Sequence, residues 1–96
     1  MTKNSINVVV AGATGYVGLD LVFFLSKHPK VKIVNLCAQK NIGKSISFFD
    51  SRIKKKLPKI CKIKTVNWNK VDLLYLSLPN GEAQKLIKRL YNNYSN

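Results

Sequence analysis

Val8-Val-Val-Ala-Gly-Ala-Thr-Gly-Tyr-Val-Gly18 is the stretch that decides the fold of this 96-residue chain. It includes most of a nearly continuous apolar run from Ile6 to Ala11, which is typical of a strand buried on both faces of a parallel sheet. Gly12 to Gly15 predicts a tight turn, and Tyr16 to Lys27 predicts a deeply buried helix that ends before Pro29. A strand, a glycine turn and a helix in this order begin many α/β folds.

Two clear strands, one short strand and one more helix are predicted downstream. Val31 to Ala38 and Val71 to Leu78 have the apolar character of strands, and Glu82 to Tyr91 has apolar residues at helical spacing. Residues 45–64 have no clear pattern, and Thr65 to Trp68 is predicted as a short strand. The short links between elements favour right-handed β-α-β units. The sequence therefore predicts an α/β fold, a partial Rossmann-like parallel sheet of about three to four strands with flanking helices.

Three glycines between the first strand and helix indicate a phosphate-binding turn. Gly12 permits the tight turn, Gly15 lets a pyrophosphate approach the backbone, and Gly18 lets the helix pack closely on the strand. The N–H groups at the helix start attract phosphates. A turn that needs glycine for packing alone is the alternative, but the flanking strand and helix favour a dinucleotide site. The predicted binding residues are Gly12, Ala13, Thr14, Gly15, Tyr16, Val17 and Gly18.

The end of the second predicted strand indicates which dinucleotide binds. NAD-specific proteins of this fold place an Asp or Glu there to bind the ribose 2′-hydroxyl group. This chain has no acidic residue between Asp20 and Asp50. Because a lysine attracts a 2′-phosphate that a carboxylate would repel, we predict NADP(H) as the cofactor, with Gln39, Lys40 and Lys44 in the site. The alternative for each lysine is an ordinary solvated surface residue.

The third clear strand is followed by Ser77-Leu-Pro-Asn-Gly81. Ligands of open α/β sheets bind beyond the carboxyl ends of the strands, so we expect Ser77 and Pro79 to contact the cofactor. An ordinary turn between a strand and a helix explains the same residues equally well.

The formal charge of +13 raises the question of nucleic-acid binding. The excess is almost entirely lysine, because Arg52 and Arg89 are the only arginines among 17 basic residues. Base recognition favours the arginine fork, and the lysines are spread along the chain. We therefore expect no nucleic-acid partner. A basic α/β module that binds nucleic acid is the alternative, and its affinity would fall steeply with salt.

The two cysteines and the chain start indicate neither a metal site nor secretion. Cys37 and Cys61 form no C-x-x-C pair, so we predict neither a disulfide scaffold nor a metal centre. The first residues contain no apolar signal segment, and no apolar run approaches the length of a membrane span. We expect no membrane association and a cytoplasmic location.

Four segments together resemble the N-acetyl-γ-glutamyl-phosphate reductases. They are Gly12–Gly18, His28-Pro-Lys-Val31, Asn41-Ile-Gly-Lys44 and Leu76-Ser-Leu-Pro-Asn-Gly-Glu82, and together they span most of residues 7–90. The resemblance implies an oxidoreductase of arginine biosynthesis that reduces N-acetylglutamyl 5-phosphate with NADPH to N-acetylglutamate 5-semialdehyde. In that family a cysteine thiolate attacks the acyl phosphate, and hydride transfer to the resulting thioester releases the aldehyde.

The resemblance also implies that residues 1–96 are the N-terminal portion of an NADP-binding Rossmann domain. The family's catalytic cysteine and histidine lie in a second domain, which we expect to be absent here. We therefore assign no catalytic residue and expect this chain alone to be inactive, while a small-molecule substrate binds through the missing domain of a full-length homo-oligomer. Two alternatives are a fragment of aspartate-semialdehyde dehydrogenase, against which the Leu-Pro-Asn-Gly turn argues, and a non-enzymatic NADP-sensing Rossmann protein.

Overall fold

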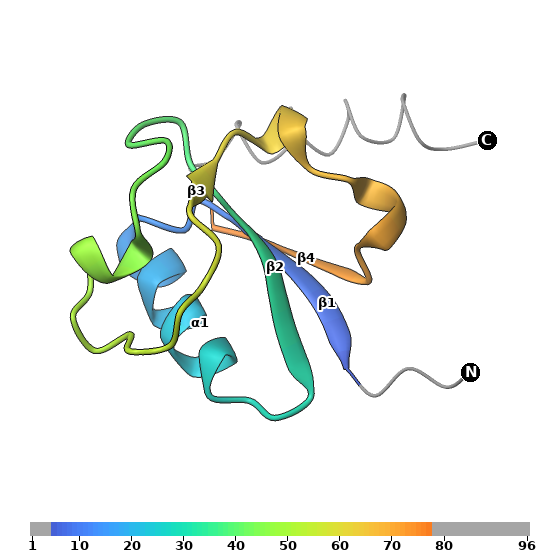
Figure 1. Cartoon of the computed structure of the whole chain (residues 1–96), viewed down its shortest axis with the longest axis horizontal. Helices are drawn as coiled ribbons and strands as arrows, with labels where there is room; N and C mark the ends of the chain where they lie inside the picture. The colour runs from blue at the N-terminus through green and yellow to red at the C-terminus, as the bar shows by residue number, and fades with distance from the viewer. Residues whose placement is uncertain (1–4, 78–96) are drawn as a thin grey trace.

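A parallel four-stranded sheet organises the computed structural model, which describes residues 5–77 (Figure 1). The strand order in the sheet is β3-β2-β1-β4, so β2 and β4 lie on opposite sides of β1. The elements are β1 (Ile6–Ala11), α1 (Tyr16–Ser26), β2 (Val31–Cys37), the 3₁₀ helix η1 (Ile46–Phe48), β3 (Ile60–Cys61), the 3₁₀ helices η2 (Ile63–Thr65) and η3 (Trp68–Lys70), and β4 (Leu73–Leu76). Doubly wound sheets begin with this strand order, which reverses between β1 and β4.

The predicted fold class, a partial Rossmann-like parallel sheet, is confirmed with four strands. Strand β1 has the predicted bounds, and α1 and β2 each end one residue earlier than predicted. Strand β4 occupies the centre of the strand predicted over residues 71–78. The helix predicted from Glu82 to Tyr91 lies outside the described residues.

The prediction of a strand from Thr65 to Trp68 is wrong. The chain forms the 3₁₀ helices η2 and η3 around this stretch, and the Val66 N–H donates to the Ile63 carbonyl at 3.2 Å. The strand in this part of the chain is β3, which has two residues and pairs with the end of β2. So short a strand leaves no alternating pattern in the sequence, and its pairing depends on backbone groups of a distant segment.

Apolar clusters cover both faces of the sheet. The face toward α1 buries Val8, Val10, Ala13, Val22, Ile33, Leu36, Ile46 and Ile53. The opposite face buries Val9, Ala11, Cys37 and Val66, with Trp68 among the half-buried residues packed against them. Successive residues of β1 from Val8 to Ala11 therefore point into different clusters, which explains why that part of the strand is apolar at every position.

A β-bulge in β2 decides which face its last residues occupy. Val34 is an extra residue between the partners of Val8 and Val9 in the β1–β2 pairing. Without the bulge, residues 33 and 37 would share one face of the sheet. With it, Ile33 lies in the cluster toward α1 and Cys37 lies in the opposite cluster.

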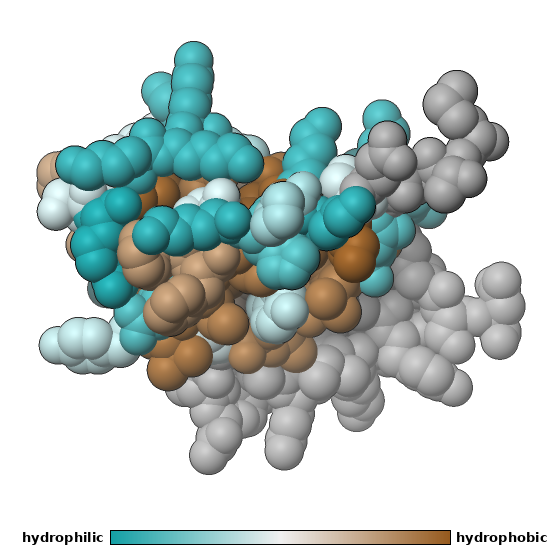
Figure 2. Space-filling model, turned by 90° about the horizontal axis from the view of Figure 1, so that it is seen from below, coloured by the Kyte–Doolittle hydropathy of each residue, from teal (hydrophilic) through white to brown (hydrophobic). Residues whose placement is uncertain are grey.

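Helix α1 is less buried than predicted. Only Gly18 and Val22 are buried, whereas Tyr16 is 95% exposed and Phe24 is 65% exposed. Figure 2 shows apolar side chains at the surface beside hydrophilic ones. The sheet covers one side of an 11-residue helix, so apolar residues on its other side remain exposed even though they fit the helical pattern.

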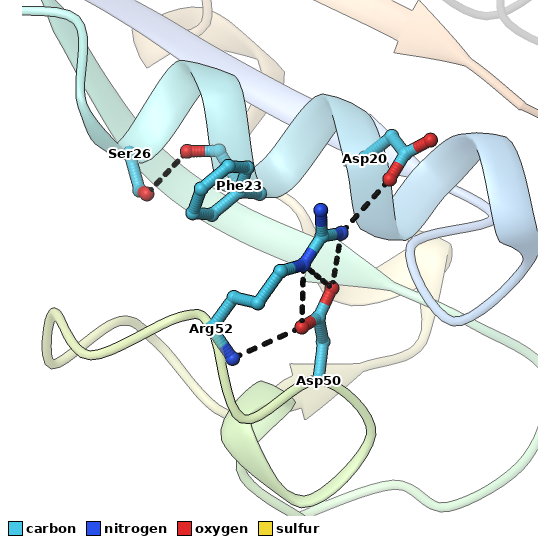
Figure 3. Close-up of polar contacts among 5 residues, drawn as sticks. All are labelled: Asp20, Phe23, Ser26, Asp50 and Arg52. Carbon is cyan, nitrogen blue, oxygen red and sulfur yellow. Dashed lines mark hydrogen bonds and ion pairs between the residues drawn. The ribbon is translucent and has the colours of Figure 1, made fainter.

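Arg52 links the segment after β2 to helix α1 through ion pairs and a cation–π contact (Figure 3). Its Nε and Nη2 atoms form a bidentate ion pair with the Asp50 carboxylate at 3.0 and 2.7 Å, and Nη2 also lies 2.8 Å from Oδ1 of Asp20 on α1. The same guanidinium lies 4.4 Å from the centroid of the Phe23 ring. One ordered side chain therefore supports two ion pairs and a cation–π contact, which a lysine ammonium cannot reproduce.

Acid weakens this contact. Hydrogen bonds from Arg52 hold the pKa of Asp50 below its ordinary value. The ion pair therefore adds stability at pH values above the pKa of Asp50 in the unfolded chain, and this contribution is lost as the pH falls through the lower pKa of the folded state.

Arg52→Lys keeps the positive charge but removes the planar fork. We expect the amide of Ile53, which donates to the Asp50 carbonyl at 3.1 Å, to exchange hydrogen several-fold faster in this variant. Lys54→Ala changes an exposed neighbour and should leave that rate unchanged. Hydrogen-exchange mass spectrometry measures both, and a wild-type rate in Arg52→Lys would show that Arg52 does not hold the segment.

Candidate functional site

The turn after β1 is fixed by backbone hydrogen bonds to the end of β2. Gly12 has φ +80°, a left-handed conformation that favours glycine. The N–H groups of Gly12 and Ala13 both donate to the Cys37 carbonyl, at 2.9 and 3.1 Å, and the Gly15 N–H donates to the Gly12 carbonyl at 3.2 Å. Every bond of this set is made by the main chain, so the position of the turn depends on the strand end beside it.

The first turn of α1 is open to an anion. Gly15 is the N-cap residue, no side chain caps the helix, and no acidic residue lies in its first turn. The first N–H groups of a helix have no partner within the helix, and its dipole places partial positive charge there. Because Gly15, Tyr16 and Val17 are exposed, this end of the helix fits the phosphate groups of a dinucleotide.

Gly15 and Gly18 differ in what surrounds them. A Cβ atom on Gly18 would lie 2.0 Å from the Gly12 carbonyl oxygen, so a side chain there cannot fit without moving the helix. A Cβ atom on Gly15 would meet only that same oxygen, at 3.7 Å, which is ordinary contact. Gly18 is therefore needed for packing, whereas the protein itself leaves room for a side chain at Gly15.

The carboxyl end of β4 lies beside the turn. Strand β4 pairs with β1 over Val8–Ala11, and the Ser77 N–H donates to the Ala11 carbonyl at 2.9 Å. Open α/β sheets form their ligand crevice where the strand order reverses, and this reversal falls between β1 and β4. Ser77 thus lies next to the turn, and Pro79 lies outside the described residues.

The loop after β2 carries the candidate contacts to the 2′-phosphate. Gln39 and Lys40 follow the end of β2 and are exposed. Strand β3 holds the far end of the loop, because the Ile60 N–H donates to the Lys44 carbonyl at 2.9 Å. The Lys44 ammonium lies 4.5 Å from the centroid of the Phe48 ring. Lys40 is therefore better placed than Lys44 to offer its charge to a ligand.

His28 and Cys37 have side chains of types that can catalyse reactions, but their contacts in this structure serve the fold. His28 is exposed in the turn before β2, and its Nδ1 accepts the Lys30 N–H at 3.0 Å. Burial raises the pKa of the Cys37 thiol far above its ordinary value and keeps it protonated near neutral pH. Between residues 5 and 77, no three side chains of His, Cys, Asp or Glu gather as a metal site requires.

Sequence patterns do not indicate two features near the turn. The Cys37 backbone carbonyl anchors the turn, but every residue type has a carbonyl group, so no residue pattern marks this role. The Sγ atoms of Cys37 and Cys61 lie 3.8 Å apart although 24 positions separate them in the sequence. Only the pairing of β2 with β3 brings these thiols together.

Comparisons with known proteins agree on one family. The model of the family described as "Semialdehyde dehydrogenase, NAD binding domain" matches residues 7–94. Similar proteins named N-acetyl-gamma-glutamyl-phosphate reductase come from Ehrlichia ruminantium (strain Gardel), 40% identical over 89 residues, and from Rhodospirillum rubrum, 35% identical over 88 residues. A probable chloroplastic N-acetyl-gamma-glutamyl-phosphate reductase of Arabidopsis thaliana is 32% identical over 89 residues.

A solved structure has a similar fold. The crystal structure of aspartate semialdehyde dehydrogenase with NADP from Candida albicans has a TM-score of 0.71 and 26% identity, over 90% of this chain and 26% of that chain. The three curated relatives are matched over 91%, 91% and 92% of this chain but over 26%, 25% and 22% of their own length. The chain thus spans about a quarter of the proteins it resembles.

Gly18→Ala is expected to lower the free energy of unfolding by about 1–3 kcal/mol, the usual cost of overpacking. Alanine favours helix by about 1 kcal/mol relative to glycine, but the 2.0 Å contact with the Gly12 oxygen outweighs that gain. Gly15→Ala is the matched control and should change stability by less than about 1 kcal/mol. Denaturant unfolding measures both, and equal stability of the two variants would contradict this assignment.

Proposed function

This chain belongs to the family of semialdehyde dehydrogenase NAD-binding domains, and on that premise we propose that it binds NADP(H) as the cofactor-binding portion of an N-acetyl-γ-glutamyl-phosphate reductase. The uncapped N-terminus of α1, placed directly after the glycine turn, is the observation that supports this proposal best. It presents backbone N–H groups and partial positive charge at the reversal of the strand order, where such ligands bind.

In the proposed complex, main-chain groups bind the pyrophosphate. The N–H groups of the first turn of α1 donate to phosphate oxygens, the Thr14 hydroxyl adds a donor, and the absence of a side chain at Gly15 allows the close approach. The Ser77 main chain, held against Ala11, lines the other side of the crevice. The proposed cofactor-binding residues are Gly12, Ala13, Thr14, Gly15, Tyr16, Val17, Gly18, Gln39, Lys40, Lys44, Ser77 and Pro79.

We propose NADP(H) in preference to NAD(H) because the loop after β2 carries lysines and no carboxylate. Lys40 is exposed, and Lys44 lies against Phe48 at the other end of the loop. A carboxylate would accept the ribose 2′-hydroxyl of NAD(H) but repel the 2′-phosphate of NADP(H). The similar structure from Candida albicans was solved with NADP.

The proposed reaction of the whole protein is the reduction of N-acetylglutamyl 5-phosphate to N-acetylglutamate 5-semialdehyde. NADPH supplies the hydride, and residues 1–96 hold and orient it as part of the Rossmann domain. We assign the nucleophilic thiol to a catalytic domain outside residues 1–96, because the family that this chain resembles carries its catalytic cysteine in a second domain and because Cys37 is buried out of reach of a substrate. Reduction of an aspartyl phosphate is the alternative. The similar structure of an aspartate semialdehyde dehydrogenase, at 26% identity, supports it less than the relatives at 32–40% identity support the proposed reaction.

We further propose that the whole protein is a cytoplasmic homo-oligomer that acts on a small molecule without a nucleic-acid partner. No helix within the described part of the chain has the length and apolar character of a membrane span. The basic residues include a single arginine between residues 5 and 77, and Asp20 and Asp50 engage its guanidinium.

Lys40→Glu places a carboxylate in the loop after β2. We expect this variant to bind NADPH at least about tenfold more weakly, because the new charge repels the 2′-phosphate. It should bind NADH at least as tightly as the wild type does, because the new carboxylate can accept the ribose 2′-hydroxyl. Lys56→Glu makes the same change of net charge at another exposed position and should alter NADPH affinity much less. Fluorescence titration at one fixed salt concentration measures the dissociation constants. Wild-type protein that binds NADH as tightly as NADPH would refute the cofactor assignment.

A chimera tests whether residues 7–94 can serve as the cofactor-binding portion of an N-acetyl-γ-glutamyl-phosphate reductase. Residues 7–94 replace the matching segment of the Rhodospirillum rubrum relative, and we expect phosphate-dependent reduction of NADP⁺ with N-acetylglutamate 5-semialdehyde but not with aspartate 4-semialdehyde. Gly15→Ala in the chimera should raise KM for NADP⁺ several-fold, since its Cβ atom occupies space assigned to the pyrophosphate. The 96-residue chain alone should show no turnover, and turnover by it would contradict the assignment of the nucleophile to other residues.

A further inference from the structure

Two free thiols lie side by side on neighbouring strands. Cys37 on β2 is the register partner of Cys61 on β3, and their Sγ atoms are 3.8 Å apart. Neighbouring strands lie about 4.8 Å apart, which falls within the range of Cα separations that disulfides span. The sulfurs need to approach to about 2.05 Å, so the bond requires a shift of the two strands and no rearrangement of the sheet.

The two thiols differ in accessibility. Cys37 is 2% exposed, and its burial raises the pKa of the thiol. Cys61 is half-buried, and its sulfur accepts a hydrogen bond from Nδ2 of Asn35 at 3.5 Å. An oxidant in solution therefore reaches Cys61 first, and Cys37 stands behind it as the second thiol.

We propose that Cys37 and Cys61 are a redox-modification site that a peroxide converts into a reversible disulfide. The Cys61 sulfur attacks hydrogen peroxide, an S–O bond forms as the O–O bond breaks, and Cys61 becomes a sulfenic acid with release of one water molecule. The Cys37 sulfur then attacks the Cys61 sulfur, the S–O bond breaks, and the Cys37 proton leaves with the departing hydroxide as a second water. Two thiols are oxidised by two electrons in all, and one peroxide is reduced to two waters.

The length of β3 favours this bond. Strand β3 has two residues and lies at the edge of the sheet, where it pairs with β2 alone among the described strands. An edge strand held by so few ladder bonds can move toward its neighbour at lower cost than a central strand. A small contraction between β3 and β2 is the motion that the disulfide requires.

The disulfide also affects the glycine turn, a consequence that rests on the proposed function. The Cys37 carbonyl accepts the N–H groups of Gly12 and Ala13, and the Ala38 N–H donates to the Cys61 carbonyl at 3.2 Å. A disulfide that draws Cys37 toward β3 therefore moves the acceptor that positions the turn. Because a displaced turn no longer presents its N–H groups correctly to the phosphates, oxidation lowers NADPH affinity, and bound cofactor in turn resists oxidation.

The first experiment detects the bond itself. The chain contains only these two cysteines, so an intramolecular disulfide lowers its mass by two hydrogens and leaves no thiol to alkylate. We expect hydrogen peroxide to produce this species and dithiothreitol to reverse it. Cys61→Ser should retain one thiol and resist the same dose, whereas Cys37→Ala should carry sulfenic or sulfinic acid on Cys61. Trp68, the single tryptophan, packs in the same cluster as both cysteines, and its fluorescence should fall in oxidised wild type alone.

Other products would overturn the proposal. Sulfinic acid on Cys61 beside an unmodified Cys37 in wild type would show that the second thiol does not reach the first. Covalent dimers linked through Cys61 would show that the partner thiol belongs to another molecule. Since Cys61→Ser alters a half-buried residue, it keeps the test informative if Cys37→Ala fails to fold.

The second experiment measures coupling to the cofactor. We expect the oxidised protein to bind NADPH about three- to tenfold more weakly than the reduced protein. By linkage, saturating NADPH should shift the equilibrium between disulfide and thiols, measured in a dithiothreitol redox buffer, toward the thiols by the same factor. A disulfide that leaves NADPH affinity unchanged would overturn the coupling. Reduced protein that binds no NADPH but still forms the disulfide would refute the proposed function and leave the redox-modification site standing.

Discussion

Helix α1 lies against the turn after β1 so closely that the Gly12 carbonyl oxygen occupies the space that a Cβ atom on Gly18 would need. This packing sets the direction of the helix and places its N-terminus at the carboxyl end of β1. The turn is held in its own place by two N–H groups on the Cys37 carbonyl. Backbone atoms make all of these contacts, so the fold itself positions the N-terminus of α1.

Most of the fold could be predicted from the sequence because its central elements are locally determined. The apolar run Ile6–Ala11 and the helical pattern after Gly15 match β1 and α1, and they need no knowledge of distant residues. Strand β3 could not be predicted, since two residues carry no periodicity and their partners lie in β2. The burial of α1 was overestimated for a related reason: an apolar residue such as Phe24 fits the pattern whether or not another element covers it.

The residues of the candidate site also differ in whether the sequence alone could predict their positions. Gly12 and Gly18 could be predicted because the left-handed φ of Gly12 and the close packing at Gly18 both favour glycine. The predicted role of Gly15 concerns the approach of a ligand, because the fold itself leaves room for a side chain there. Ser77 was expected to contact the cofactor because it follows a strand; its N–H donates to the Ala11 carbonyl beside the turn, and the contact with the cofactor stays a prediction. The contact of Lys44 with Phe48 and the meeting of Cys37 with Cys61 depend on how separate segments pack. A sequence pattern supplies the residue types for such contacts but not their neighbours.

The strand order has a consequence for how the site is assembled during folding. Val8 pairs with Ile33, 25 positions later in the chain, and on its other side with Leu73, 65 positions later. Closing the longer loop costs about 0.8 kcal/mol more in chain entropy. The glycine turn therefore belongs to the local β-α-β unit, whereas the position of Ser77 beside it depends on the most distant strand pairing among the described residues. During synthesis, β4 and Ser77 cannot pair with β1 until the chain up to residue 77 has emerged from the ribosome.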